Sequence, residues 1–168
     1  VTARSDDAER ESDTPGEDLA RWHREWGLVV PAGNPDGVDG VEDLAETGGR
    51  FANLGTDISI RRALDSTLEA ADIPAADIPG YHRDLPGLAS AARAVGAGEA
   101  DVGLGLRQTA AALGLGFVAL GTQTVHLGVA DPRRGKPAVE RLVDRLETQA
   151  PDLLAETPGY HALSVESS

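Results

Sequence analysis

The chain has 168 residues, of which 15 are basic and 28 acidic, giving a formal net charge of −13. This length suits one domain with a substantial core. The acidic surplus disfavours binding of nucleic acid or of anionic membranes by this segment. The sequence has no cysteine, which excludes disulfides and thiolate metal sites, and its four histidines (His23, His82, His126, His161) lack the spacing of metal ligands. We therefore expect no metal and no cofactor.

The first residues differ in composition from the rest of the chain. Residues 1–18 are polar and mostly charged, which predicts a disordered acidic leader before a domain at 19–168. The chain starts at valine and contains no methionine, so we expect it to be a piece of a longer protein. It shows neither an apolar run of membrane-spanning length nor a signal peptide, which predicts a cytoplasmic location.

The first half of the domain predicts alternating strands and helices. The apolar run at 27–33 is typical of a buried strand, "GVEDLAETGG" (40–49) of a short helix ended by glycines, and "RFANL" (50–54) of a second strand. Apolar residues at helical spacing predict a helix from Ser59 to about Asp72, and another covers roughly 85–97.

The second half continues the alternation. "ADVGLGL" (100–106) predicts a strand and is followed by a short alanine-rich helix; "GFVAL" (116–120) and "TVHLGVA" (124–130) predict two further strands. An amphipathic helix then carries Val139, Leu142, Val143 and Leu146 on one face, and the chain ends in an extended segment. This order predicts an α/β fold with a mainly parallel or mixed sheet and helices on both faces. In such sheets, ligands bind at the carboxyl ends of strands.

The stretch "RFANLGTDISIRRALD" (50–65) carries the main candidate site. A short strand passes through a tight polar turn into a helix, an arrangement that directs free backbone N–H groups at an anion. Asp57 lies in this turn and has two interpretations. It could cap the helix on a degenerate site, or it could belong to an altered anion site together with Thr56, Ser59, Arg61 and backbone N–H groups.

Other residues also have two interpretations. Arg61 is either an anion clamp or a solvated side chain, and Asp101 either lines a cleft or ends a strand. Trp22 and Trp26 are four residues apart, which fits one face of a helix and a core role rather than a ligand platform. His126, in an apolar strand, is typical of a buried histidine with satisfied hydrogen bonds.

Motifs for catalysis are weak. "GLGLRQ" (103–108) lacks the third glycine of a dinucleotide loop, and "RRGKPA" has proline where a phosphate loop needs Ser or Thr. Ser59, His126 and Asp101 could form a triad, but no nucleophile elbow accompanies them. We therefore expect a non-catalytic protein.

The chain resembles a known family from about residue 22 to 161. "WHREWGLVVPAGNPDGVDGVEDLA", "RFANLGTDISIRRALD", "GYHRDLPGLASAARAVGAGEADVGLGLRQTAAALGLGFVALG" and "TPGY" are similar, in order and spacing, to the type II periplasmic-binding-protein-like domain. That domain is found fused to helix-turn-helix DNA-binding domains and to molybdopterin-biosynthesis proteins. The resemblance implies a two-lobed clamp with a molybdate- or tungstate-like oxyanion between the lobes.

The resemblance also implies differences from the family. The family's opening segment, which builds much of the first lobe, is absent here. Asn53, Arg61 and Asp65 are kept, whereas the family's Gly-Ser-Gly-Thr run before the arginine reads Asp-Ile-Ser-Ile at 57–60. Gly87 and Leu88 replace a Thr-His pair, and Gln123, Val125 and His126 replace a Glu, a Tyr and an Asp. These changes remove oxyanion donors.

Two functions follow from the resemblance. The first is a cytoplasmic ligand-sensing domain that binds a small anion through Asn53, Thr56, Asp57, Ser59, Arg61 and Asp101 and reports to a fused or partner DNA-binding domain. The alternative is a ligand-free dimerisation or interaction module with the same fold, in which a homodimer covers the apolar face left by the missing segment. The acidic, lysine-poor composition also resembles that of haloarchaeal proteins.

Overall fold

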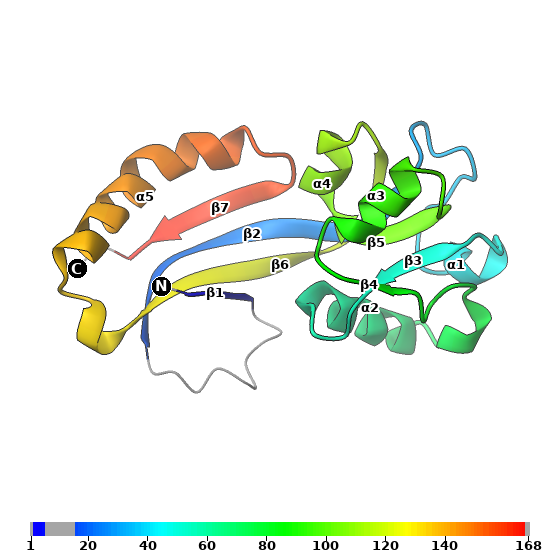
Figure 1. Cartoon of the computed structure of the whole chain (residues 1–168), viewed down its shortest axis with the longest axis horizontal. Helices are drawn as coiled ribbons and strands as arrows, with labels where there is room; N and C mark the ends of the chain where they lie inside the picture. Colours follow the sequence, from blue (N-terminus) through cyan, green and yellow to red (C-terminus); the bar gives the residue numbers. More distant parts are fainter. Residues whose placement is uncertain (1, 6–15, 167–168) are drawn as a thin grey trace. The chain divides into compact units, whose positions relative to one another are not determined.

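A computed structural model describes residues 2–5 and 16–166 of the chain. The chain divides into two compact units, one formed by residues 1–24 and 122–168 and the other by residues 25–121. Two long strands, β2 (Gly16–Val30) and β6 (Gly116–Ala130), contribute to both units (Figure 1). The strands are hydrogen-bonded in the order β1-β6-β2-β5-β3-β4, and β7 pairs with β2.

The unit at 25–121 holds most of the helices and the parallel strands. Between its parts of β2 and β6 it contains α1 (Asp43–Glu46), β3 (Phe51–Leu54), α2 (Ser59–Ala70), the 3-10 helix η2 (Ala75–Asp77), β4 (Asp84–Leu85), α3 (Ser90–Gly96), β5 (Val102–Leu106) and α4 (Arg107–Ala112). Strand β3 pairs in parallel with β4 and with β5, whereas β5 pairs antiparallel with β2. The sheet is therefore mixed, as predicted, with parallel pairing in β5-β3-β4.

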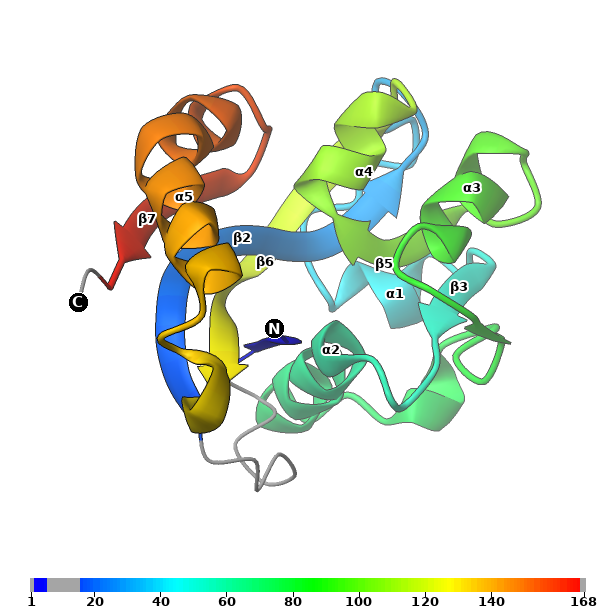
Figure 2. The same cartoon turned by 60° about the vertical axis from the view of Figure 1, so that its left-hand side comes forward.

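Strand β5 explains how helices cover both faces of this sheet. Its sequence VGLGL alternates large apolar residues with Gly103 and Gly105, so that one face is bulky and the other nearly flat. A Cβ atom added to Gly103 would lie 3.0 Å from the backbone oxygen of Ala91 in α3. The absence of a side chain thus lets α3 approach the strand closely. Helix α2 lies on the opposite face (Figures 1 and 2).

Helix α2 confirms the helical spacing of its sequence. Ile60, Leu64 and Leu68 fall on one face and are buried in the main hydrophobic core with Phe51 and Leu104. The helix ends at Ala70, and Asp72 has a positive φ of 57°, a conformation that stops helix propagation. Burial of this face positions the start of α2 directly after strand β3.

The second unit packs one long helix on the sheet. It contains β1 (Thr2–Ser5), its parts of β2 and β6, the 3-10 helix η3 (Asp131–Arg133), α5 (Pro137–Ala155) and β7 (Tyr160–Val165). Strand β1 pairs antiparallel with β6, and β7 pairs antiparallel with β2. Val139 of α5 is buried with Leu19 and Val129 in a small core, and the rest of the predicted apolar face (Leu142, Val143 and Leu146) packs against this core.

Several sequence predictions need correction. Residues 2–5 form β1 and residues 16–18 already belong to β2, so these parts of the expected leader are ordered strands; residues 6–15 lie outside the described part of the chain. The strands expected at 116–120 and 124–130 are one strand, because Gly121 continues the extended backbone. The helix expected at 85–97 begins only at Ser90, after the short strand β4.

The two tryptophans lie in a strand, not in a helix. Trp22 and Trp26 both belong to β2, where a spacing of four residues also returns to the same face. Trp26 is buried in the main core, as expected. The spacing alone could not distinguish the two periods.

Candidate functional site

The carboxyl ends of the parallel strands meet at one edge of the sheet in the unit at 25–121. Phe51 of β3 is paired with Val102 of β5, so the two strands end side by side, at Leu54 and Leu106. Helices α2 and α4 begin just after these ends. This edge, which we call the carboxyl edge (residues 54–61, 84–90 and 106–109), is where open α/β sheets bind ligands.

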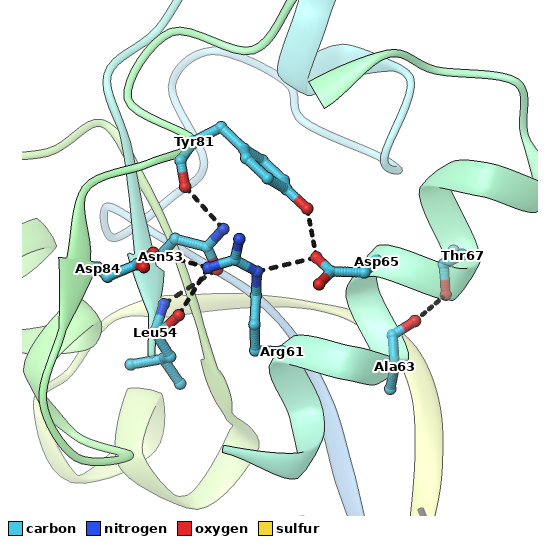
Figure 3. Close-up of polar contacts among 8 residues, drawn as sticks. All are labelled: Asn53, Leu54, Arg61, Ala63, Asp65, Thr67, Tyr81 and Asp84. Atoms are coloured by element: carbon cyan, nitrogen blue, oxygen red, sulfur yellow. Dashed lines mark hydrogen bonds and ion pairs between the residues drawn. The ribbon is translucent and has the colours of Figure 1, made fainter. Parts of the chain in front are cut away.

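Arg61 is buried at the carboxyl edge and is held by groups of the protein itself. Its side chain is 5% exposed, and its Nε donates to Oδ1 of Asp65 at 2.8 Å (Figure 3). Nη1 donates to the backbone oxygen of Leu54 and to Oδ1 of Asp84, both at 2.7 Å. One guanidinium therefore joins the end of β3, the first turn of α2 and strand β4.

Tyr81 closes this cluster from one side. The guanidinium carbon of Arg61 lies 4.5 Å from the centre of the Tyr81 ring, and the Tyr81 hydroxyl donates a short hydrogen bond to Asp65 (Figure 3). Burial and the bond to Asp65 raise the pKa of Tyr81. Burial lowers the pKa of Arg61, but hydrogen bonds to Asp65 and Asp84 outweigh it, so that the pKa is raised overall.

The charge of this cluster is negative. One guanidinium is offset by the two carboxylates of Asp65 and Asp84. An incoming anion would compete with both carboxylates for the same donors. Arg61 is therefore not the solvated side chain of one prediction, because its observed bonds hold the loops of the edge in place. Its role as an anion clamp stays a prediction.

Asn53 also makes internal bonds. Its side chain is fully buried, and Nδ2 donates to the backbone oxygen of Tyr81 at 3.0 Å, while Oδ1 accepts from the N–H of Leu54 at 2.9 Å. These bonds satisfy the amide inside the core. Asn53 therefore fixes the segment that carries Tyr81 against β3.

The turn between β3 and α2 holds the remaining predicted residues. Thr56 and Asp57 are exposed, and Ser59, the first residue of α2, is half-buried. The N-cap residue of α2 is Ile58, with no side-chain cap hydrogen bond, so the expected cap by Asp57 is not formed. The Asp57 carboxylate instead lies over Gly55, where an added Cβ would be 2.6 Å from Oδ1.

Asp101 lies at the other edge of the sheet. It precedes β5, whereas the carboxyl edge follows β5, so the structure does not bring Asp101 together with Thr56, Asp57 and Ser59. Its Oδ2 accepts from the backbone N–H of Arg50 at 2.7 Å, and both oxygens accept from the Arg50 side chain. These bonds lower the pKa of Asp101 to about 2.

Sequence reasoning did not identify Arg107 of the carboxyl edge, nor the carboxylates that pair with the two arginines of this edge. Arg107, the first residue of α4, donates to Glu25 and lies over the Phe117 ring at 4.8 Å. Asp65 could have been assigned to Arg61 from its (i, i+4) spacing on a helix. Asp84 and Glu25 are 23 and 82 residues from their arginines, so nothing local identifies them. Both arginines at this edge are paired with carboxylates.

His126 and the described helices add two further observations. Nδ1 of His126 lies 2.7 Å from Oδ2 of Asp18, so this histidine is satisfied, as expected, but it is half-buried and not buried. Within residues 16–166, no helix is both long enough and apolar enough to span a membrane.

Comparison with known proteins places this geometry in context. Residues 19–147 match the family model of the PBP (periplasmic-binding-protein) superfamily domain. The uncharacterized protein YvgK of Bacillus subtilis is 32% identical over 97 residues, which are 58% of this chain; the match spans only 32% of YvgK, about a third of its length.

Solved structures share the fold. A substrate-binding domain assigned to a molybdenum ABC transporter from Clostridium difficile superposes with a TM-score of 0.58 and 19% identity, over 95% of this chain and 71% of that one. A histidine kinase sensor domain with similarity to periplasmic binding proteins gives a TM-score of 0.54 and 17% identity, over 94% of this chain and 68% of that one. At these identities the likeness concerns the fold.

Proposed function

Because the chain belongs to the PBP superfamily, whose model covers residues 19–147, we propose that it is a non-catalytic domain that binds a small ligand and senses it. The ligand we propose is an oxyanion of the molybdate or tungstate type. The fold it shares with a molybdenum-transporter binding domain and with a kinase sensor domain supports this proposal. A cytoplasmic location and an attached DNA-binding domain remain predictions.

The observation that carries the proposal is the start of α2. This helix of 12 residues begins without a side-chain cap, directly after the carboxyl end of β3. The first N–H groups of a helix, together with its dipole, attract anions. Thr56 and Ser59 add hydroxyl donors next to them. Because Arg61 and Arg107 are paired internally, these neutral donors would hold the oxyanion.

Asp57 is the residue that decides whether an anion is accepted. Its exposed carboxylate lies in the turn that leads into α2 and would repel an anion bound there. It also competes for the same N–H groups if it rotates toward them. We therefore expect Asp57→Asn to bind an oxyanion more tightly than the wild type.

Thermal unfolding with molybdate, tungstate, sulfate or phosphate, added singly, tests the proposal. An oxyanion at 100 times its dissociation constant should stabilise the fold by about 2.7 kcal/mol, which raises the midpoint by about 5 °C or more. Asp36→Asn is the matched control, because Asp36 is exposed and follows β2, which runs antiparallel to β5 and so ends at the other edge. The site is supported if an oxyanion raises the unfolding midpoint of the wild type, and if this rise is larger in Asp57→Asn but not in Asp36→Asn.

The interaction module remains the second candidate. It is favoured by the internal bonding of Asn53, Arg61 and Asp101. A dimerisation module should have an exposed apolar face. In the part of the chain described, however, the exposed large hydrophobic residues are Leu113 and Leu153, which lie in different units and form no common face within one unit. If no oxyanion shifts the midpoint of either Asp57 form and light scattering shows a dimer, this module replaces the sensor.

A further inference from the structure

Two histidines far apart in the sequence face each other in the unit formed by residues 1–24 and 122–168. His23 of β2 and His161 of β7 are cross-strand partners in an antiparallel pair. Their ring centroids are 5.7 Å apart and the ring planes are inclined by 39°. Directly opposed residues of antiparallel strands project their side chains on the same face, so both rings share one surface of the sheet.

The backbone is irregular where the pair forms. The register of β2 against β7 shifts between Arg21 and His23, which indicates a β-bulge, and Ala162 has a positive φ of 56°. An alanine in this conformation is uncommon. Bulges redirect side chains, and here the shifted register sets His23 opposite His161.

A neighbouring hydroxyl orients one of the rings. Oγ1 of Thr124 lies 3.1 Å from Nδ1 of His23. When the hydroxyl accepts a hydrogen bond from Nδ1–H, the lone pair of Nε2 is free to bind an ion. Metal-binding histidines are commonly held by a hydrogen bond of this kind. His161 is exposed and His23 half-buried, so an ion can reach both rings.

From this geometry we propose that His23 and His161 bind a divalent transition-metal ion of the class that prefers imidazole, namely Cu²⁺, Ni²⁺ or Zn²⁺. With a metal–nitrogen bond of about 2 Å, each ring centroid lies roughly 3 Å from the ion, so two rings sharing an ion are separated by up to about 6 Å. The observed 5.7 Å meets this condition. The net charge of −13 raises the local concentration of cations.

The site has two protein ligands. Across residues 2–5 and 16–166, no group of three or more His, Asp or Glu side chains is arranged to hold a metal. Water completes the coordination sphere, which places this site among the weaker ones and makes its occupancy dependent on the metal supply. The site is independent of the carboxyl edge, because its residues belong to the other unit.

Titration calorimetry of the whole chain with Ni²⁺, in a buffer that does not chelate metals and with excess Mg²⁺ to saturate carboxylates, tests the site. We expect one ion per chain, and binding at least about tenfold weaker in His23→Ala and in His161→Ala. His82→Ala is the matched control, because His82 is an exposed histidine in the other unit. The affinity of this variant for Ni²⁺ should stay within about twofold of that of the wild type.

Paramagnetic broadening gives a second measurement, which locates the bound ion instead of measuring its affinity. Ni²⁺ should broaden the backbone amide signals at 21–24 and 160–163, the two strand segments that carry the histidines. The proposal is overturned if affinity is unchanged in both His23→Ala and His161→Ala, if His82→Ala weakens binding as much as they do, or if Mg²⁺ displaces the ion. Unchanged circular dichroism of the variants would show that lost binding is not lost folding.

Discussion

Replacing Arg61 by Met should destabilise the protein by about 3 to 5 kcal/mol. The backbone oxygen of Leu54, in a fully buried residue, would lose its bond to Nη1, and an unsatisfied buried acceptor costs about 1 to 3 kcal/mol. Asp65 and Asp84 would lose their cation, but their side chains are 40% and 45% exposed and can be rehydrated. The loss of each of these two ion pairs therefore adds only about 1 kcal/mol to the destabilisation. Methionine retains the apolar stem, so no large cavity adds to the cost.

Urea denaturation followed by circular dichroism measures this change. Arg93→Met is the matched control, because Arg93 is an exposed arginine of helix α3 in the same unit; we expect a change below about 0.5 kcal/mol. Arg61→Lys should lose at least half as much as Arg61→Met, since one ammonium cannot reach Leu54, Asp65 and Asp84 with the geometry of a guanidinium. A loss below about 1 kcal/mol for Arg61→Met would refute the argument that the buried guanidinium holds the edge.

Two further changes test the backbone and the opposite edge of the sheet. The pKa of Asp101 is about 2 in the folded chain, below its ordinary value of 3.8, so its bond to Arg50 stabilises the fold above about pH 4 and this contribution is lost as the pH falls toward 2. The difference in stability between wild type and Asp101→Asn, measured by urea denaturation at each pH, should therefore shrink from about pH 4 to pH 2. A difference that stays constant would contradict this prediction. Gly80→Ala should destabilise the protein by at least about 2 kcal/mol more than Gly98→Ala in the same assay. Both glycines have positive φ, but only at Gly80 would the new Cβ lie 2.4 Å from the backbone oxygen of Phe51. Equal losses of stability would show that the backbone adjusts.

Local patterns of the sequence determined most of the elements. Ile60, Leu64 and Leu68 predicted α2, and the alternation in "VGLGL" is that of β5, because a regular backbone repeats its buried face at a fixed period. Patterns that fit two kinds of secondary structure did not predict the right one. Trp22 and Trp26 fit a strand as well as a helix, and a polar first segment gave no sign that residues 2–5 pair with β6. Such strands are decided by the partner, not by their own composition.

Tertiary structure decided which residues make up the candidate site. The sequence itself placed Thr56, Asp57 and Ser59 in a turn between a strand and a helix, since that depends on neighbours along the chain. That Arg61 is bound by Asp84, and that Asp101 lies at the opposite edge, depends on strand order and on parallel pairing. His23 and His161 meet across a bulged register for the same reason. Charges and ligands act through distance in space, and a single sequence encodes distance only between residues that are close along the chain.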